Sequence, residues 1–236
     1  MTTVVGIDLA AGRGTTEVVA LRCPGTREPP RYLQHLRQHT ITDADIAAAV
    51  ASASPTVIAI DAPLSLPAGV MAALRGAAAT SGAGGSPYTR AAEREGVWST
   101  LGVRPLPVSF LGGLTLRAIM LVPRLRAAWP GAAIIEVFPT ATLAALGLRL
   151  PLGRESRPRK TSVAARRTAL RGLAGYIDGV EDPERELASA DELDALAAAL
   201  TAVRYLEGAF VAVGDASEGQ IVLPFPFIDA DATLEN

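Results

Sequence analysis

A continuous apolar run from Thr56 to Ile60 (TVIAI), closed by Asp61-Ala62-Pro63, has the pattern of a strand that is buried on both faces. Strands of this kind occupy the centre of a parallel or mixed sheet whose faces are covered by helices. The run therefore predicts a layered α/β architecture built around one sheet.

Three strands are predicted ahead of this run. Thr3–Leu9 is rich in β-forming residues, Thr15–Leu21 (TTEVVAL) follows a glycine-rich turn, and Arg31–Thr40 alternates between apolar and polar residues. A helix is then expected from a Thr42 cap through an alanine-rich stretch to Ala53. The order strand, strand, strand, helix, strand predicts an antiparallel meander joined by a helical crossover to a parallel strand.

The second half of the chain continues the alternation of helices and strands. We expect a helix over Leu116–Trp129, a buried strand over Ala132–Phe138 and a short helix opened by Pro139. A last helix is expected from Ser189, which has capping-box spacing to Glu192, to about Glu207. With neither a linker nor an internal repeat in the sequence, we expect one domain over residues 1–236, with insertions around 70–115 and 150–185.

Composition narrows the functional classes. The chain has 49% hydrophobic and 19% charged residues, which favours a compact globular protein over a disordered one. Its net charge of −2 gives no global signal for nucleic acid, so a polyanion would need a local basic patch. The single cysteine excludes an internal disulfide and a cysteine-rich zinc site. Without a basic N-terminal leader or an apolar stretch of membrane-spanning length, we expect a cytoplasmic protein that does not enter a membrane.

Acidic residues stand where the apolar patterns call for hydrophobic ones. Asp8 ends VVGID, Asp61 ends VIAID, and Glu136 lies within AIIEVF. Any one of them could be an ordinary strand-end acid that caps the following turn. Three on separate central strands favour a ligand site, because the carboxyl ends of such strands are where ligands bind in open α/β sheets.

The last predicted helix adds acids to this set. Asp191 and Asp194 are three residues apart and project from nearly the same face, and the small residues around Asp194 would let the helix lie close to the sheet. Clustered carboxylates repel one another unless a cation offsets them. Ligation by oxygen alone is typical of Mg²⁺ or Mn²⁺, which can activate a water for phosphodiester hydrolysis.

These motifs together resemble the DUF429 family, predicted nucleases of the ribonuclease H-like superfamily. The matching segments are GIDLA (6–10), IAIDAPLSLP (58–67), the Arg90/Glu93 segment, EVFPTA (136–141), Lys160-Thr161 and DELDALAAALTA (191–202). The resemblance implies a ribonuclease H-like fold, with a mixed central sheet flanked by helices, and a nuclease activity. It also implies that Asp8, Asp61 and Asp194 are metal ligands, that Glu136 is a fourth and that Asp191 is an accessory one.

Basic residues provide candidates for substrate binding. A dense segment with Arg154, Lys160 and Arg171 could follow a phosphate backbone, or could be a solvated surface. Arg90 lies beside a glycine-rich loop and could contact a scissile phosphate. We therefore expect Arg90 and Lys160 to bind substrate. His35 and His39 are about 13 Å apart on a strand, too far to chelate one ion.

Two other functions compete with a metal-dependent nuclease. The turn GIDLAAGRGTT resembles the first phosphate loop of the actin, Hsp70 and sugar-kinase group, although the chain has no convincing second copy of that motif. A binding module that keeps the fold without catalysis is the other alternative, since a fold does not determine a function. The identity of a nucleic acid substrate and the oligomeric state are not encoded in any motif.

Overall fold

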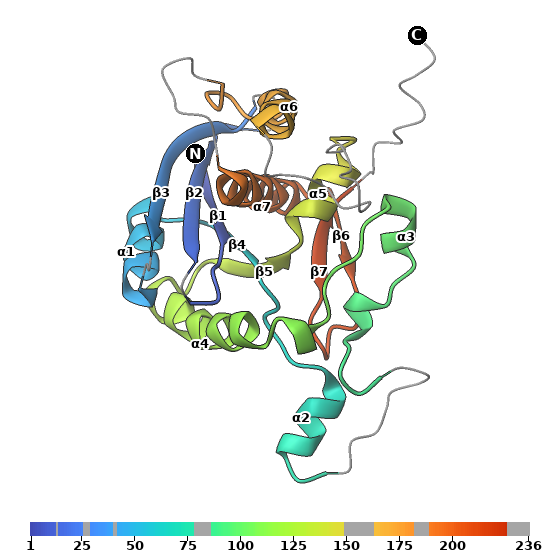
Figure 1. Cartoon of the computed structure of the whole chain (residues 1–236). Coiled ribbons are helices and arrows are strands. Elements are labelled where there is room, and N and C mark those ends of the chain that lie inside the picture. Colours follow the sequence, from blue (N-terminus) through green and yellow to red (C-terminus); the bar gives the residue numbers. More distant parts are fainter. Residues whose placement is uncertain are drawn as a thin grey trace.

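A mixed sheet forms the centre of the protein (Figure 1). The computed structural model describes residues 1–12, 14–25, 29–39, 42–77, 86–148, 163–181 and 189–225. Within these ranges the sheet has seven strands in the order β3-β2-β1-β4-β5-β7-β6. The strands are β1 (Thr2–Asp8), β2 (Thr15–Cys23), β3 (Arg31–His39), β4 (Val57–Asp61), β5 (Ala133–Val137), β6 (Phe210–Val213) and β7 (Ile221–Pro224).

The pairing of the strands confirms the predicted meander and crossover. β1, β2 and β3 are antiparallel neighbours, and β4 and β5 then pair in parallel beside β1. The TVIAI run forms β4, whose first four residues are buried, as expected for a central parallel strand. β7 also pairs in parallel with β5, and β6 closes the edge as the antiparallel partner of β7.

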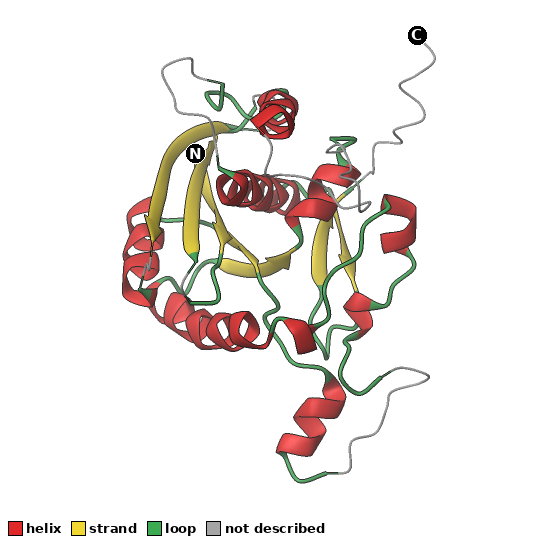
Figure 2. Ribbon diagram, viewed as in Figure 1, coloured by secondary structure: helices red, strands yellow, loops and turns green. Residues whose placement is uncertain are grey.

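Helices cover both faces of the sheet (Figure 2). On one face α7 (Ala190–Leu206) packs on the strands, and α5 (Pro139–Ala145) and α6 (Val163–Ala174) pack beside it. On the other face lie α1 (Asp43–Ala53) and α4 (Gly112–Ala128). The short helices α2 (Ala68–Leu74) and α3 (Val97–Leu101) and the 3₁₀ turns Ala91–Glu93 and Val108–Phe110 belong to the segment between β4 and α4.

Several elements differ from the expectations. α4 begins four residues before the expected Leu116, because the glycines at 112 and 113 enter the helix instead of delaying it. The hairpin of β6 and β7 was not predicted, since each strand has only four residues and carries little periodicity.

The two expected helix caps are present. Thr42 caps α1 in a reciprocal capping box with Asp45, and Ser189 caps α7 by accepting from the Glu192 N–H. Every helix within the described ranges is too short or too polar to cross a bilayer.

The close approach of α7 to β1 depends on Gly6. A Cβ built on Gly6 would overlap the carbonyl oxygen of Ala195 and the backbone of Ala199. Because Gly6 has no side chain and the facing helix residues are alanines, the helix backbone lies directly against the strand. This contact therefore sets how close α7 lies to the sheet and where the helix lies along β1 and β4.

Gly6→Ala is expected to destabilise the protein by about 1–3 kcal/mol, because inserting a methyl group into a packed core costs that much. The free energy of unfolding, measured by urea denaturation, checks this. Gly131→Ala is the matched control, since a Cβ there meets nothing within 4 Å. Equal losses for the two variants would contradict the close packing at Gly6.

Candidate active site

Asp8 and Asp61 are neighbours at the carboxyl ends of two adjacent parallel strands. Asp8 is the last residue of β1, Asp61 is the last residue of β4, and the two are register partners. Partners in a parallel pair point to the same face of the sheet. That face is the one covered by α7, because Gly6, two residues before Asp8, lies against α7. Both carboxylates are half-buried.

Glu17 extends this row of acids onto a third strand. It is the β2 register partner of Asp8 and is fully buried, with 0% of its surface exposed. Its Oε1 accepts a hydrogen bond of 3.1 Å from the hydroxyl of Ser189, which also caps α7. Glu17 therefore ties the start of α7 to the sheet beside Asp8. We call Glu17, Asp8 and Asp61 the acidic row.

The start of α7 brings a further acid toward this row. Asp191 lies one helical turn before Ala195, the residue that faces Gly6, and is half-buried. Asp191 and Asp8 line one open hollow of about 490 Å³ together with the β1–β2 turn, which we call the turn pocket. Asp194 is also half-buried and lies three residues further along the helix. Thus Asp191 is the helix acid that shares a pocket with Asp8.

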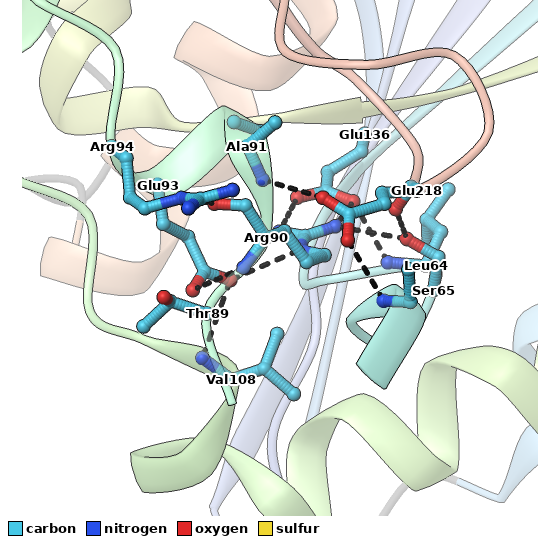
Figure 3. A network of polar contacts seen from close by, with 12 residues as sticks. Leu64, Ser65, Thr89, Arg90, Ala91, Glu93, Arg94, Val108, Glu136 and Glu218 are labelled. Carbon is cyan, nitrogen blue, oxygen red and sulfur yellow. Dashed lines mark hydrogen bonds and ion pairs between the residues drawn. The ribbon is translucent and has the colours of Figure 1, made fainter. Parts of the chain in front are cut away.

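Glu136 points to the opposite face of the sheet. Its register partner on β4 is Ile60, one residue before Asp61, so strand alternation places it on the side of α1 and α4. There the guanidinium of Arg90 binds it in a bidentate pair, with bonds of 2.7 and 2.6 Å to the two carboxylate oxygens (Figure 3). The Leu64 N–H donates to the same carboxylate at 2.9 Å.

Arg90 joins several chain segments in a buried cluster. It is 1% exposed, and it also donates to Glu93 and to the hydroxyl of Ser65. The Ser65 hydroxyl donates to the carbonyl of Glu218, whose carboxylate accepts from the N–H groups of Ala68 and Ala91 (Figure 3). We call Ser65, Arg90, Glu93, Glu136 and Glu218 the Arg90 cluster.

Burial and charge shift the pKa values of Glu136 and Arg90. Burial raises the pKa of Glu136 above its usual value, while the hydrogen bonds and charge of Arg90 oppose the rise. Burial alone would lower the pKa of Arg90, but the bonds to Glu136 and then Glu93 raise it. Arg90 is therefore a fixed cation, and its four bonds hold Glu93, Glu136 and Ser65 in place.

A second pocket lies at the same edge of the sheet. It has a volume of about 200 Å³ and is lined by Asp8, Asp61, Arg90 and Glu136, but most of its wall is apolar, including Leu106, Leu111 and Phe138. We call it the apolar pocket. Asp8 lines both this pocket and the turn pocket, so both hollows lie beside the end of β1.

The predicted site residues are thus divided between two faces of the sheet. Asp8 and Asp61 are together, Asp191 shares a pocket with Asp8, and Glu136 is paired with Arg90 on the other face. Within the described ranges, no group of three or more His, Cys, Asp or Glu side chains is spaced to hold a metal ion. The donor chemistry of Asp8 and Asp61, carboxylate oxygen alone, fits Mg²⁺ or Mn²⁺. Lys160 and the basic segment before α6 lie outside the described residues.

A family comparison agrees with the sequence motifs. The family model described as "Protein of unknown function (DUF429)" matches residues 6–218. The chain belongs to the DUF429 family. No curated protein sequence matches this DUF429 protein.

Solved structures provide a comparison of shape. Thermus thermophilus RuvC has 14% identity to this DUF429 protein and a TM-score of 0.47, over 88% of this chain and 97% of that one. T. thermophilus RuvC in complex with a Holliday junction substrate has 15% identity and a TM-score of 0.47, over 88% and 96% of the two chains. A fowlpox virus resolvase with Holliday junction DNA has 9% identity and a TM-score of 0.43, over 87% and 99%. Similarities this low leave the activity to be inferred from the chain's own residues.

Sequence reasoning missed Glu17 and Glu218, and it named Glu93 only as part of a matching segment, without a role. Glu17 stands within the β-rich run TTEVVAL, and its position opposite Asp8 follows only once the β1–β2 register is known. An acid inside an apolar strand pattern was the available signal, and it is the same signal that drew attention to Glu136. Glu218 lies in the connection between the unpredicted strands β6 and β7, where the sequence carries no periodic pattern.

Arg90→Met is expected to destabilise the DUF429 protein by about 3–5 kcal/mol, because it leaves the buried carboxylate of Glu136 without its cation. The matched control is Arg204→Met, which removes a partly exposed ion pair with Glu207 and is expected to cost about 1 kcal/mol or less. Urea unfolding of both variants measures the difference. Similar losses would mean that the Arg90 pair is no stronger a constraint than a surface pair.

Ser189→Ala is expected to cost more stability than Thr42→Ala. Both remove an N-cap hydroxyl, a loss of about 1 kcal/mol, but Ser189 also donates to the buried carboxylate of Glu17. Withdrawing that donor adds about 1 kcal/mol or more. Thermal and urea unfolding compare the two variants, and a smaller loss at Ser189 would show that the bond to Glu17 contributes nothing.

Proposed function

We propose that this protein is a divalent-metal-dependent nuclease with a ribonuclease H-like fold. The observation that carries the proposal is the pairing of Asp8 and Asp61 in register at the carboxyl ends of adjacent parallel strands. Two carboxylates so close repel each other unless a cation lies between or beside them. Asp191 is the helix acid best placed to join them, since it shares the turn pocket with Asp8.

The topology supports the ribonuclease H-like assignment. An antiparallel meander of β1 to β3 is followed by α1 and by β4 and β5 in parallel beside β1, in the order β3-β2-β1-β4-β5. The family resemblance implies the same fold, and the lack of a linker or internal repeat in the sequence favours one domain over residues 1–236. The hairpin of β6 and β7 then extends the sheet at the β5 edge.

The chain's own residues have separate roles in this proposal. Asp8 and Asp61 would hold Mg²⁺ or Mn²⁺ as a pair, and Asp191, which shares the turn pocket with Asp8, would add negative charge beside the ion, with Asp194 three residues further along α7. When bound, the metal would lower the pKa of a water and offset charge on the leaving oxygen of a phosphodiester. Glu17 and Ser189 hold the start of α7 against the sheet. Glu136 and Arg90 hold Leu64, and thereby the segment that leaves Asp61.

Asp8→Asn and Asp61→Asn are expected to weaken Mn²⁺ binding and nuclease activity by on the order of a hundredfold or more, beyond the 10–100-fold that loss of an indirect partner costs. Calorimetry with Mn²⁺ and Mg²⁺ measures binding. Cleavage is assayed on single-stranded, duplex and four-way-junction DNA and RNA, the junction being the substrate named for the RuvC and fowlpox resolvase complexes. Chelation with EDTA should abolish cleavage.

Glu207→Gln is the control, since Glu207 stands just beyond the far end of α7 from Asp191 and pairs with Arg204 on the surface. It should bind metal and cleave as the wild type does. Absence of metal binding at millimolar concentration would contradict the proposed site. Tight ATP binding without cleavage would instead favour a phosphotransferase, and nucleic acid binding without cleavage would favour a binding module.

A further inference from the structure

The apolar pocket is placed where a substrate held at Asp8 and Asp61 would meet it. Both acids line it, and the remaining wall is built largely from apolar side chains that include Pro105, Leu106 and Phe138. Arg90 and Glu136 also line it, but they are held by each other. A phosphate group gains nothing from walls of this kind, whereas a flat apolar ring does.

The volume of the pocket limits what can enter. About 200 Å³ corresponds to about seven water molecules at ~30 Å³ each, and lies below the 300–1,000 Å³ typical of sites for drug-sized ligands. A single nucleobase ring system has this size, and a base pair does not fit. A pocket of this volume therefore suits one unpaired nucleobase and is too small for a base pair.

The turn pocket has room for the part of the nucleic acid strand that continues beyond Asp8. It is larger and more open, and its wall includes the turn residues Ala10 and Gly12 as well as Asp191. Asp8 is common to both pockets. A strand crossing Asp8 would thus have a base on one side, in the apolar pocket, and continuing backbone on the other, along the β1–β2 turn.

We propose that the apolar pocket receives one unpaired nucleobase of the strand whose phosphate lies at Asp8 and Asp61. This rests on the proposed nuclease function and specifies its substrate class: a nucleic acid with an unpaired nucleotide at the cleavage position. A base in a duplex must leave its stack before it enters such a pocket, so single-stranded or locally unpaired DNA or RNA binds better than continuous duplex.

Replacing Leu106 tests the apolar pocket with little effect on the fold. It lines the pocket while 60% of its surface is exposed, so replacing it removes little core packing. Leu74 is 71% exposed on α2 and lies outside the described lining of the pocket. Leu106→Asp and Leu74→Asp therefore introduce the same charge at two exposed leucines, of which one belongs to the pocket.

The test measures oligonucleotide binding separately from cleavage. Wild type and both leucine variants are measured in Ca²⁺ without Mg²⁺ or Mn²⁺, so that Asp8 and Asp61 are intact in every protein compared. Fluorescence anisotropy compares a labelled single strand, its duplex, and a series of single strands with one abasic position moved along the sequence. The ratio of intact to abasic affinity cancels the general repulsion between an added aspartate and the phosphates.

The expected result is that one abasic position weakens binding by about fivefold to a hundredfold, the range for loss of one stacked base. Leu106→Asp should reduce that ratio toward one, and Leu74→Asp should preserve it. Equal affinity for all abasic strands, equal affinity for duplex and single strand, or identical ratios in the two leucine variants would overturn the base pocket. Base-dependent binding without any cleavage by wild type in Mn²⁺ would support the pocket and reject the nuclease, so the two proposals fail separately.

Discussion

The contact between α7 and β1 at Gly6 determines the geometry of the whole site. With no side chain on Gly6 and alanines facing it, the helix backbone rests directly on the strand. This contact sets how close α7 lies to the sheet and which side of the helix faces β1. Asp191, one turn before Ala195, therefore lies near the end of β1 and shares a pocket with Asp8. The bond from Ser189 to Glu17 fixes the same helix at its first turn. Two independent contacts thus position the helix acid, one by packing and one by a buried hydrogen bond.

Strand alternation places the acids of the site on two opposite faces of the sheet. Asp8 and Asp61 point to the α7 face, and Glu136, one register position lower on β5, points to the face of α1 and α4. An isolated buried carboxylate is costly, so Glu136 persists because Arg90 and a backbone N–H bind it. Such a pair contributes little net stability compared with apolar packing, but it fixes one arrangement of the segments that it joins.

The sequence predicted the centre of the fold because strong local patterns specify it. The apolar run that forms β4, the Thr42 cap and the alternation of strands and helices all agree with the structure. The face on which each acid lies could not be predicted, since a register change of one residue moves a side chain to the other face. Arg90 was expected to bind substrate; it lines the apolar pocket and is also paired with Glu136, a contact between residues 46 apart that no local pattern encodes. The β6–β7 hairpin was not predicted for a similar reason, because its strands are defined by their pairing in the tertiary structure and not by periodicity in the sequence.

The short segment after β4 connects the two groups of acids. Asp61 ends the strand, and only three residues later the Leu64 N–H donates to Glu136. Pro63 between them has a fixed φ, which shortens the range of conformations open to this link. A displacement of Glu136 would therefore move the backbone that follows Asp61, although the two carboxylates point to opposite faces. The Arg90 cluster can in this way influence the position of Asp61 through the backbone, because the chain between Asp61 and Leu64 has little freedom to absorb a change.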